Sequence, residues 1–196
     1  MKKLFGLAAL LVAATFTLAA CGSNDSTSAG SGSGDHNKQD VTFASDMIPH
    51  HEQAIQMAKM AKAHAGSTDV KQLADDIEAA QGPEIKTMAG WLKAWGEDAP
   101  SGSMSGRGGM GGMGGTSNND VPGMMSDDDM TKLGQATGAT FDQMWLKGMI
   151  AHHEGAVVMA NTEIAKGKNA DAIDLAKTIK TAQTKEIATM KKMLGS

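Results

Sequence analysis

Cysteine is almost absent from this sequence, since Cys21 is the only one in 196 residues. A single cysteine excludes a disulfide within the chain and a Cys-x-x-Cys-His haem attachment site. The formal net charge is −4 and no basic stripe is present, which argues against nucleic acid as a partner. No segment alternates apolar and polar residues as a strand does, and the sequence contains neither a nucleophilic triad nor a phosphate-binding loop. We therefore expect an all-helical protein that is not an enzyme.

The only long uncharged, largely apolar run, Leu4–Ala20, follows Lys2 and Lys3 at the N-terminus. It predicts a secretory signal peptide over residues 1–20. The run ends in Leu-Ala-Ala-Cys, which resembles the lipobox of bacterial lipoproteins and implies that Cys21 is lipidated. We expect an extracytoplasmic protein that a lipid anchor holds at the bacterial cell membrane. The alternative, an uncleaved helix, is short for a membrane span of ~20 apolar residues.

Residues 21–40 are mostly Gly, Ser and charged side chains. Such a composition buries too little apolar surface to offset the entropy of ordering, so it predicts a flexible tether. His36 lies in this tether and is expected to be solvated. The remaining residues, 41–196, are expected to form the folded domain.

A motif with two adjacent histidines occurs twice. Met47-Ile48-Pro49-His50-His51 returns 102 residues later as Met149-Ile150-Ala151-His152-His153. The same offset, without a gap, repeats Leu73, Ile77, Ala80, Gln81, Glu84, Ile85, Met88 and Leu92 as Leu175, Ile179, Ala182, Gln183, Glu186, Ile187, Met190 and Leu194. A repeat this regular indicates two copies of one supersecondary unit.

Each copy is expected to be a pair of helices. In the first, apolar residues recur at three- and four-residue steps from Phe43 to Ala61, which predicts an amphipathic helix over about residues 45–65, with Pro49 distorting its start. Residues 66–69 (Gly-Ser-Thr-Asp) supply a break and an N-cap for a second helix. We therefore predict an all-α, ferritin-like four-helix bundle made of hairpin one (43–95), a long Gly/Met-rich insert (96–140) and hairpin two (141–196).

The insert decides how the hairpins are connected. Residues 101–120 are glycine-rich and expected to be disordered, whereas Ser126 and three following aspartates predict a short helix that ends near Gly134. A connection this long could run along the bundle, as in ferritin-like folds. The two motifs would then lie on the order of 12 Å apart, at 1.5 Å per residue, and form two separate sites. A simple up-down-up-down bundle would instead bring them to one level and permit a shared site.

Each hairpin is expected to hold an imidazole against a carboxylate. In a hairpin that turns near residue 67, His50 lies beside Glu84, and His51 falls about 100° further round, at the edge of the apolar face. The same neighbourhood contains Met47, Asp46 and Met88 in the first copy, and His152, His153, Glu186, Met149 and Met190 in the second. A glutamate in an apolar stripe is costly to bury unless it is paired or bound to a metal. Two interpretations remain, a buried His–Glu pair that fixes the register of the bundle and a cluster of metal ligands.

The methionines favour a soft metal. The chain has 16 methionines, and the insert, which has little core to fill, contains Met104, Met110, Met113, Met124, Met125 and Met130. Thioethers suit Cu(I), and imidazole binds copper in either oxidation state. We expect copper as the bound ion, with Cu(I) favoured and silver as the other candidate. The secondary ligand candidates are Asp46, Met57, Met159, Met110, Met113, Met124 and Met125. Met57 lies two turns from His50, which is more consistent with a core residue.

The two histidine motifs, together with Gln81-x-x-Glu84-Ile85-x-x-Met88 and its copy Gln183–Met190, resemble the signature of the CopM-like family, catalogued as domain of unknown function 305. The resemblance extends from Phe43 to Leu194, apart from the glycine-rich insert. It implies a ferritin-like helical bundle that is secreted or lipidated and binds copper outside the cytoplasm. On the matching positions, it implies that His50, His51, His152, His153 and the nearby methionines are the ligands.

We therefore expect a membrane-tethered protein that sequesters Cu(I) or exchanges it with a copper donor or acceptor protein. Two other functions remain open. In one, the bundle is structural or binds a partner, its His–Glu pairs stabilise the packing, and no metal binds. In the other, the bundle is a di-iron oxidase, which needs two Glu-x-x-His motifs and two further inward glutamates, whereas only Glu84 and Glu186 are well placed here. The sequence does not indicate an oligomeric state.

Overall fold

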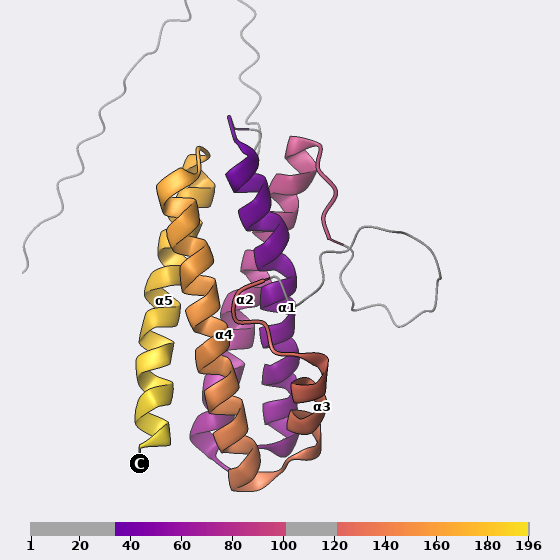
Figure 1. Cartoon of the computed structure of the whole chain (residues 1–196), viewed down its shortest axis with the longest axis vertical. Helices are drawn as coiled ribbons and strands as arrows, with labels where there is room; N and C mark the ends of the chain where they lie inside the picture. Colours follow the sequence, from indigo (N-terminus) through magenta and orange to yellow (C-terminus); the bar gives the residue numbers. More distant parts are fainter. Residues whose placement is uncertain (1–33, 101–120, 196) are drawn as a thin grey trace, which may run out of the picture. The chain divides into compact units, whose positions relative to one another are not determined.

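The structure is a computed structural model that describes residues 34–100 and 121–195. Within these ranges it contains five helices (Figure 1), namely α1 (Lys38–His64), α2 (Thr68–Trp95), α3 (Asp127–Gln135), α4 (Gly138–Lys166) and α5 (Ala170–Leu194). None of the helices in the described part of the chain combines the length and apolarity of a membrane span. The expected signal peptide, Cys21 and the glycine-rich run with Met104, Met110 and Met113 lie outside the described residues.

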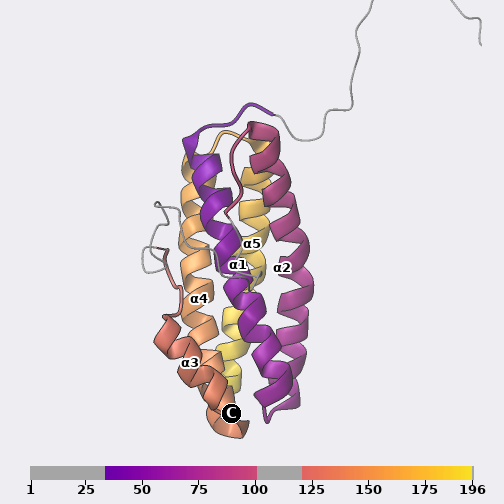
Figure 2. The ribbon, with the colours of Figure 1, turned by 90° about the vertical axis from the view of Figure 1, so that its right-hand side faces the viewer.

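The four long helices form the predicted bundle. A short loop joins α1 to α2, another joins α4 to α5, and each pair runs antiparallel (Figure 1). The two hairpins pack together mainly through α1 and α4, which also run antiparallel (Figures 1 and 2). Because α2 ends at the opposite end of the bundle from the start of α4, the connection between them has to span the bundle. The hairpins therefore have the ferritin-like arrangement.

The first helix begins earlier than predicted. α1 starts at Lys38, seven residues before the expected position, and continues through Pro49 without a break. The cause is a capping box, in which the Asn37 side chain accepts hydrogen bonds from the backbone of the first turn and the Asp40 carboxylate accepts one from the Asn37 N–H at 2.6 Å. This box lies ahead of the first periodic apolar residue, so hydrophobic periodicity alone places the start too late.

Other local features can be compared residue by residue. Ser126 caps α3, as predicted, and the N-cap expected within residues 66–69 is Ser67. His36 was expected to be solvated, which is wrong, because its ring stacks on Trp95 with centroids 4.6 Å apart and planes inclined by 11°. His36 thus contacts the end of α2 two residues before α1 begins.

The longer α1 brings the two histidine motifs to one level. His51 is the central residue of α1, and His152 is the central residue of α4. Because the two helices lie antiparallel side by side, their centres meet, and the ring centroids of His50 and His152 are 3.7 Å apart. The expectation that a crossover connection separates the motifs by about 12 Å is therefore wrong. It depended on a helix starting near residue 45, which places His50 away from the helix centre.

A matching pair of aspartates joins the two hairpins at their ends. Asp40 of α1 accepts hydrogen bonds from the backbone N–H groups of residues 168–169, in the α4–α5 loop, at 3.0 and 2.9 Å. Asp142 of α4, at the repeat offset, accepts from residues 66–67 in the α1–α2 loop at 3.1 and 2.9 Å. The first helix of each hairpin therefore holds the loop of the other, which gives the bundle a pseudo-twofold symmetry.

The hydrophobic core is divided into two buried clusters. Along α1, one cluster contains residues up to Ile48, and the other cluster contains residues from Ala54 onward. Along α4, the corresponding gap lies between Met149 and Ala156. Both histidine motifs lie in these gaps, so they separate one half of the core from the other.

Candidate metal centre

Four histidines occupy the gap between the clusters, and we call them the histidine layer. His50 and His51 come from α1, His152 and His153 come from α4, and each is 0 % exposed. His50 and His152 face each other across the interface of the hairpins with ring planes inclined by 36°. The two rings within a motif are further apart, with centroid separations of 6.5 and 6.3 Å. The layer thus combines both copies of the motif in one place.

The second histidine of each motif, and not the first, contacts the glutamate. His51 Nε2–H donates to Glu84 Oε2 at 2.8 Å, and His153 Nε2–H donates to Glu186 Oε2 at 2.7 Å. The predicted pairing of these glutamates with His50 and His152 is therefore wrong. The second histidines, expected at the edge of the apolar face, are fully buried and lie against partly exposed glutamates. Pairing in a hairpin gives the level along a helix but not the direction around it, and one residue turns a side chain by about 100°. The first histidines turn toward the other hairpin instead.

The first histidines have few hydrogen-bond partners. His50 Nε2–H donates to the backbone oxygen of Pro122 at 3.1 Å. Within the described residues neither ring nitrogen of His152 has a partner with hydrogen-bond geometry, although the nearby His50 backbone opposes part of the lowering of its pKa. Nδ1 of His50, His51 and His153 also lacks one there, so five buried imidazole nitrogens of the described chain are unpaired. Each unsatisfied buried polar atom costs about 1–3 kcal/mol. An ion that accepted these lone pairs would remove part of that cost.

Burial keeps the first histidines neutral. Desolvation lowers the pKa of His50 to about 3, and the neighbouring imidazoles of His51 and His153 add to this effect. Burial also lowers the pKa of His152 well below its ordinary value, with His50 and His153 as further causes. A neutral imidazole has a free lone pair on one ring nitrogen, which is the form that binds a metal ion.

The acceptors around the layer decide which ring nitrogen is free. A carbonyl oxygen or an ionised carboxylate can only accept a hydrogen bond, so the ring nitrogen that faces it has to carry the proton. This rule assigns a proton to Nε2 of His50, His51 and His153. In a neutral ring the lone pair is then on Nδ1, the atom without a partner in the described chain. Histidine ligands are commonly oriented by a carboxylate or carbonyl on the far ring nitrogen. Glu84 and Glu186 are thus placed to orient histidines.

Methionine thioethers lie on both sides of the histidine layer. Met47 and Met88 belong to one buried cluster, and Met149 and Met190 belong to the other, all with 0 % exposure. Met47 precedes His50 by three residues, about 4.5 Å along the helix, and Met149 has the same relation to His152. Met47 and Met149 are therefore within about one helical turn of the first histidines, and all four methionines are buried in the clusters that border the layer.

The secondary candidates lie elsewhere. Met57 and Met159 are core residues of the two clusters, and the Met57 backbone oxygen accepts a hydrogen bond from Trp145 Nε1–H at 3.0 Å. Asp46 is half-buried, and desolvation raises its pKa. Two further candidates, Met124 and Met125, are partly buried in the segment that precedes α3. The last two candidates, Met110 and Met113, lie outside the described residues.

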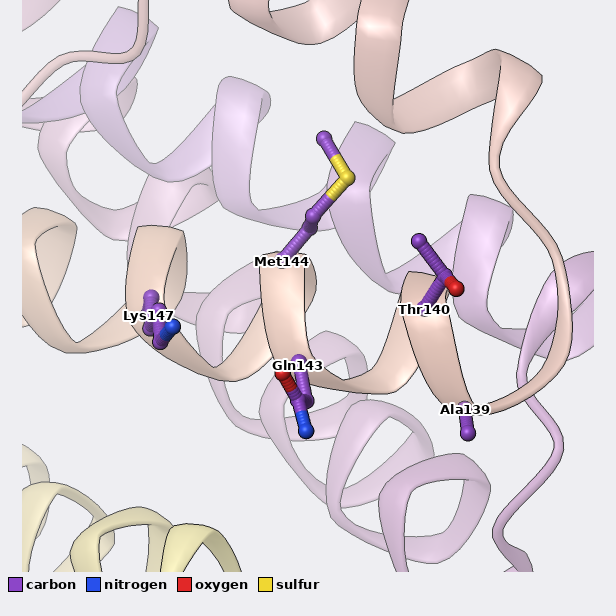
Figure 3. A pocket seen from close by; sticks show the side chains of 5 residues that line it. All are labelled: Ala139, Thr140, Gln143, Met144 and Lys147. Carbon is purple, nitrogen blue, oxygen red and sulfur yellow. The ribbon is translucent and has the colours of Figure 1, made fainter.

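Among residues 34–100 and 121–195, no three His, Cys, Asp or Glu side chains are grouped as around a metal ion. A shallow surface pocket of about 220 Å³ near the start of α4 contains none of the candidates, since it is lined by Ala139, Thr140, Gln143, Met144 and Lys147 (Figure 3). All five lining residues come from one helix, and Figure 3 shows Met144 and Gln143 projecting from it in opposite directions. The histidine layer shows no ready-made metal geometry either, and it remains the candidate site because its ring nitrogens are buried and largely unpaired within the described chain.

Three residues were not predicted as part of the site, although two of them, Gln81 and Gln183, were recognised as part of the repeat. Gln81 and Gln183 are 3 % exposed, and their side-chain oxygens have no hydrogen-bond partner among the described residues. Each of the two glutamines precedes a glutamate of the site by three residues. In the sequence, the feature that could have identified them as site residues is their recurrence at the repeat offset. Pro122 is not repeated, and its signal is the Pro-Gly pair, which is typical of a tight turn.

Several solved structures resemble this one. A DUF305 protein from Streptomyces coelicolor is 29 % identical with a TM-score of 0.69, over 80 % of this chain and 92 % of that one. CopM in its Cu(II)-bound form is 31 % identical with a TM-score of 0.63, over 80 % of this chain and 95 % of CopM. CopM in its Cu(I)-bound form is 29 % identical with a TM-score of 0.61, over 79 % of this chain and 94 % of CopM.

The sequence matches no curated protein. It does match the family model described as "Domain of unknown function (DUF305)", and the match covers residues 40–194. This range includes both helical hairpins and the whole histidine layer. The chain therefore belongs to the DUF305 family.

Proposed function

We propose that this protein binds copper or silver ions at the histidine layer, as a carrier or a store and without catalysis. The observation that carries the proposal is the set of five buried imidazole nitrogens that lack hydrogen-bond partners in the described chain. Most buried polar atoms in proteins are paired, and the exceptions are commonly functional. Burial also keeps His50 and His152 in the neutral form that a metal ion requires.

The donors at the layer favour a soft ion. Besides the imidazoles, the nearby side chains include the thioethers of Met47, Met88, Met149 and Met190, and this combination suits Cu(I). Hard ions such as Mg²⁺ need oxygen ligands, whereas Glu84 and Glu186 are engaged with the second histidines. The Cu(I)-bound and Cu(II)-bound structures of CopM support copper as the ion.

Ligation through Nδ1 fits the hydrogen bonds that already exist. A metal ion on Nδ1 of His51 or His153 leaves the Nε2–H bond to the glutamate intact. The carboxylate on the far side of the ring then offsets part of the positive charge that the ion brings. Because His50 and His152 are neutral near pH 7, neither has to release a proton when it binds the ion. Such a site can load and unload without a coupled proton transfer at these two residues.

The N-terminal sequence supports a location outside the cytoplasm. Residues 18–21 resemble a lipobox, so we include a lipid anchor on Cys21 in the proposal. An anchored domain would intercept Cu(I) near the bacterial cell membrane and either sequester it or pass it to an acceptor protein. The methionine-rich composition of the chain agrees with such a role, because thioethers bind Cu(I) but leave harder ions in solution.

The test is a Cu(I) titration of the domain without its signal peptide, in competition with a chelator. The double variant His50→Ala/His152→Ala should lose more affinity than the roughly 10–100-fold that removal of an outer partner of a ligand costs. Met57→Leu is the matched control, because Met57 is a buried core thioether two turns away, and it should bind as the wild type does. If the double variant keeps the wild-type affinity, the histidine layer is not the site.

The two His–Glu pairs also favour a second candidate, a structural bundle that binds no metal. In that case the bonds from His51 to Glu84 and from His153 to Glu186 serve only to fix the register within each hairpin. A thermal shift separates the two candidates, since an ion at 100 times its dissociation constant stabilises the folded state by about 2.7 kcal/mol. A melting temperature that does not respond to Ag(I) or Cu(I) would favour the structural candidate.

A further inference from the structure

Residues Val121–Met125 cross the outer side of α1 and α4, and we call this segment the strap. It is built on a tight turn, in which the Met124 N–H donates to the Val121 oxygen at 3.3 Å. Proline occupies the second position and Gly123, with φ of 80°, occupies the third. This is the pattern of a type II turn, in which the positive φ at the third position sets the direction of the preceding carbonyl. That carbonyl, Pro122 O, accepts the hydrogen bond from His50 Nε2–H.

The two central helices are shaped to hold the strap. On α1, the Gln53 side chain donates to Met125 O at 2.9 Å and accepts from Met125 N–H at 2.8 Å. The position on α4 that corresponds to Gln53 at the repeat offset is Gly155, where a Cβ atom would overlap the Pro122 oxygen. A glycine inside a helix costs about 0.5–1 kcal/mol relative to alanine. The same repeat position therefore contacts the strap on both helices. On α1 it is Gln53, whose side-chain amide binds the strap, and on α4 it is Gly155, which has no side chain and leaves space for the strap.

A second glycine of α4 has a similar role. At Gly148, two turns before Gly155, a Cβ atom would collide with the methyl group of Met125. The two glycines lie seven residues apart, on the same side of α4, and together they make room for the whole strap. The contact of Pro122 with His50 is thus fixed by several interactions and not by one hydrogen bond alone.

Three of the four histidines in the layer have an acceptor on Nε2. Glu84 serves His51, Glu186 serves His153, and the strap serves His50. A neutral imidazole without such an acceptor exchanges its proton between the two ring nitrogens. Its lone pair is then on Nδ1 only part of the time.

We propose that the strap is a positioning element of the metal site, and that Pro122 O holds His50 in the Nε2–H tautomer so that Nδ1 is the ligating atom. The strap thereby does for His50 what Glu84 does for His51. This inference rests on the proposed function for its consequence in metal binding, but the tautomer is a property of the metal-free protein and can be measured alone.

The test compares two strap variants with a matched control. Gly123→Ala places a side chain where φ is positive, which costs about 1–2 kcal/mol, and its Cβ would lie 2.6 Å from Ala151 O, so the turn has to change. Gln53→Ala removes both hydrogen bonds to Met125 without adding an atom. The control is Gly90→Ala, the same change on α2, where a Cβ meets no atom of the described residues within 4 Å.

The readout is the long-range ¹H–¹⁵N spectrum of the histidine rings in metal-free, ¹⁵N-labelled protein at pH 7, which distinguishes the two tautomers. In wild type and Gly90→Ala, His50 should be in the Nε2–H form. In both strap variants it should become a mixture, while His51 and His153 do not change. Silver affinity, measured by competition, should fall roughly 10-fold in the strap variants and stay constant in the control.

Two results would overturn the inference. One is a His50 ring that keeps the Nε2–H form in both strap variants or that already populates the Nδ1–H form in wild type. The other is a changed tautomer with unchanged silver affinity. A wild-type protein that binds no silver counts against the proposed function instead, and the tautomer spectra then still decide whether the strap positions His50.

Discussion

Replacement of His152 by leucine should make the metal-free protein more stable while it weakens metal binding. His152 is fully buried, and neither of its ring nitrogens has a hydrogen-bond partner in the described ranges. Each such atom costs about 1–3 kcal/mol, and a leucine side chain has no polar atom to desolvate. Loss of the ring contact with His50, at 3.7 Å between centroids, removes about 0.5–1.5 kcal/mol of this gain. We expect a net stabilisation of about 0.5–5.5 kcal/mol from these opposing effects, with the middle of the range at ~3 kcal/mol.

The assay is urea unfolding with a chelator present, together with calorimetry. In a domain of this size, 1 kcal/mol shifts the melting temperature by roughly 2–4 °C, so a stabilisation of ~3 kcal/mol raises it by about 6–12 °C. The same variant, titrated with Ag(I), should bind more weakly than wild type. Higher stability with lower affinity is the result expected of a buried ligand that is unsatisfied without its ion.

The adjacent histidine provides the control. His153 is equally buried, but its Nε2–H donates to Glu186, whose side chain is 21 % exposed. His153→Leu leaves that carboxylate without its donor, which costs about 1–3 kcal/mol, but it also removes the unpaired Nδ1, a gain of about the same size. The free energy of unfolding should therefore change little in His153→Leu, whereas His152→Leu should increase it. A metal-free His152→Leu protein that is less stable than wild type would refute the reasoning and support a purely structural role for the ring.

Two further predictions concern the ends of the bundle. Asp142→Ala removes the carboxylate that accepts hydrogen bonds from residues 66–67 and should lower the free energy of unfolding by about 1–3 kcal/mol. Hydrogen exchange of the backbone amides should become faster in the α1–α2 loop. If exchange becomes faster to the same extent throughout the protein, Asp142 does not act locally on this loop. Desolvation raises the pKa of Glu163 to about 8, and the adjacent Asp40 adds to the rise. The stability that neutral Glu163 contributes is therefore fully present below its ordinary pKa of 4.5 and is lost as the pH rises through about 8. In urea unfolding, the free energy of unfolding of Glu163→Gln should equal that of wild type at pH 5 and exceed it at pH 9. If the stability of the variant falls with pH as steeply as that of wild type, the assignment to Glu163 is wrong.

Most of the fold could be predicted because its signals are local. Hydrophobic periodicity, the Ser67 and Ser126 caps and the repeat offset are each read within a few residues or by direct self-comparison, and together they specify two hairpins. The start of α1 was wrong because its capping box, Asn37 with Asp40, precedes the first periodic apolar residue. This error of seven residues moved His50 away from the helix centre and led to the incorrect expectation of two separate sites.

The candidate site was predicted in composition but not in geometry. The repeat identified the histidines and glutamates that contact one another in the structure, because a duplicated unit repeats its buried polar residues. Hairpin pairing could not show that His51, and not His50, meets Glu84, since adjacent residues share a level but differ by about 100° in direction. The strap could not be found in this way, because Pro122 and Gly123 have no counterpart in the first copy. Their turn is a local signal, but the place where the turn docks depends on Gln53 and Gly155 of two separate helices.

The pseudo-twofold arrangement explains why a duplicated motif gives one centre. Antiparallel packing of α1 and α4 makes residues from the two copies meet at the axis, and His50 faces its own repeat there, His152. The two His–Glu pairs have the same geometry in both copies. The copies differ at Gln53 and Gly155, and this difference lets the strap cover only one side of the axis. One of the two facing histidines therefore has an acceptor that fixes its tautomer, while within the described chain the other has none. For this reason His152, and not His50, is the ring whose removal should stabilise the metal-free protein most.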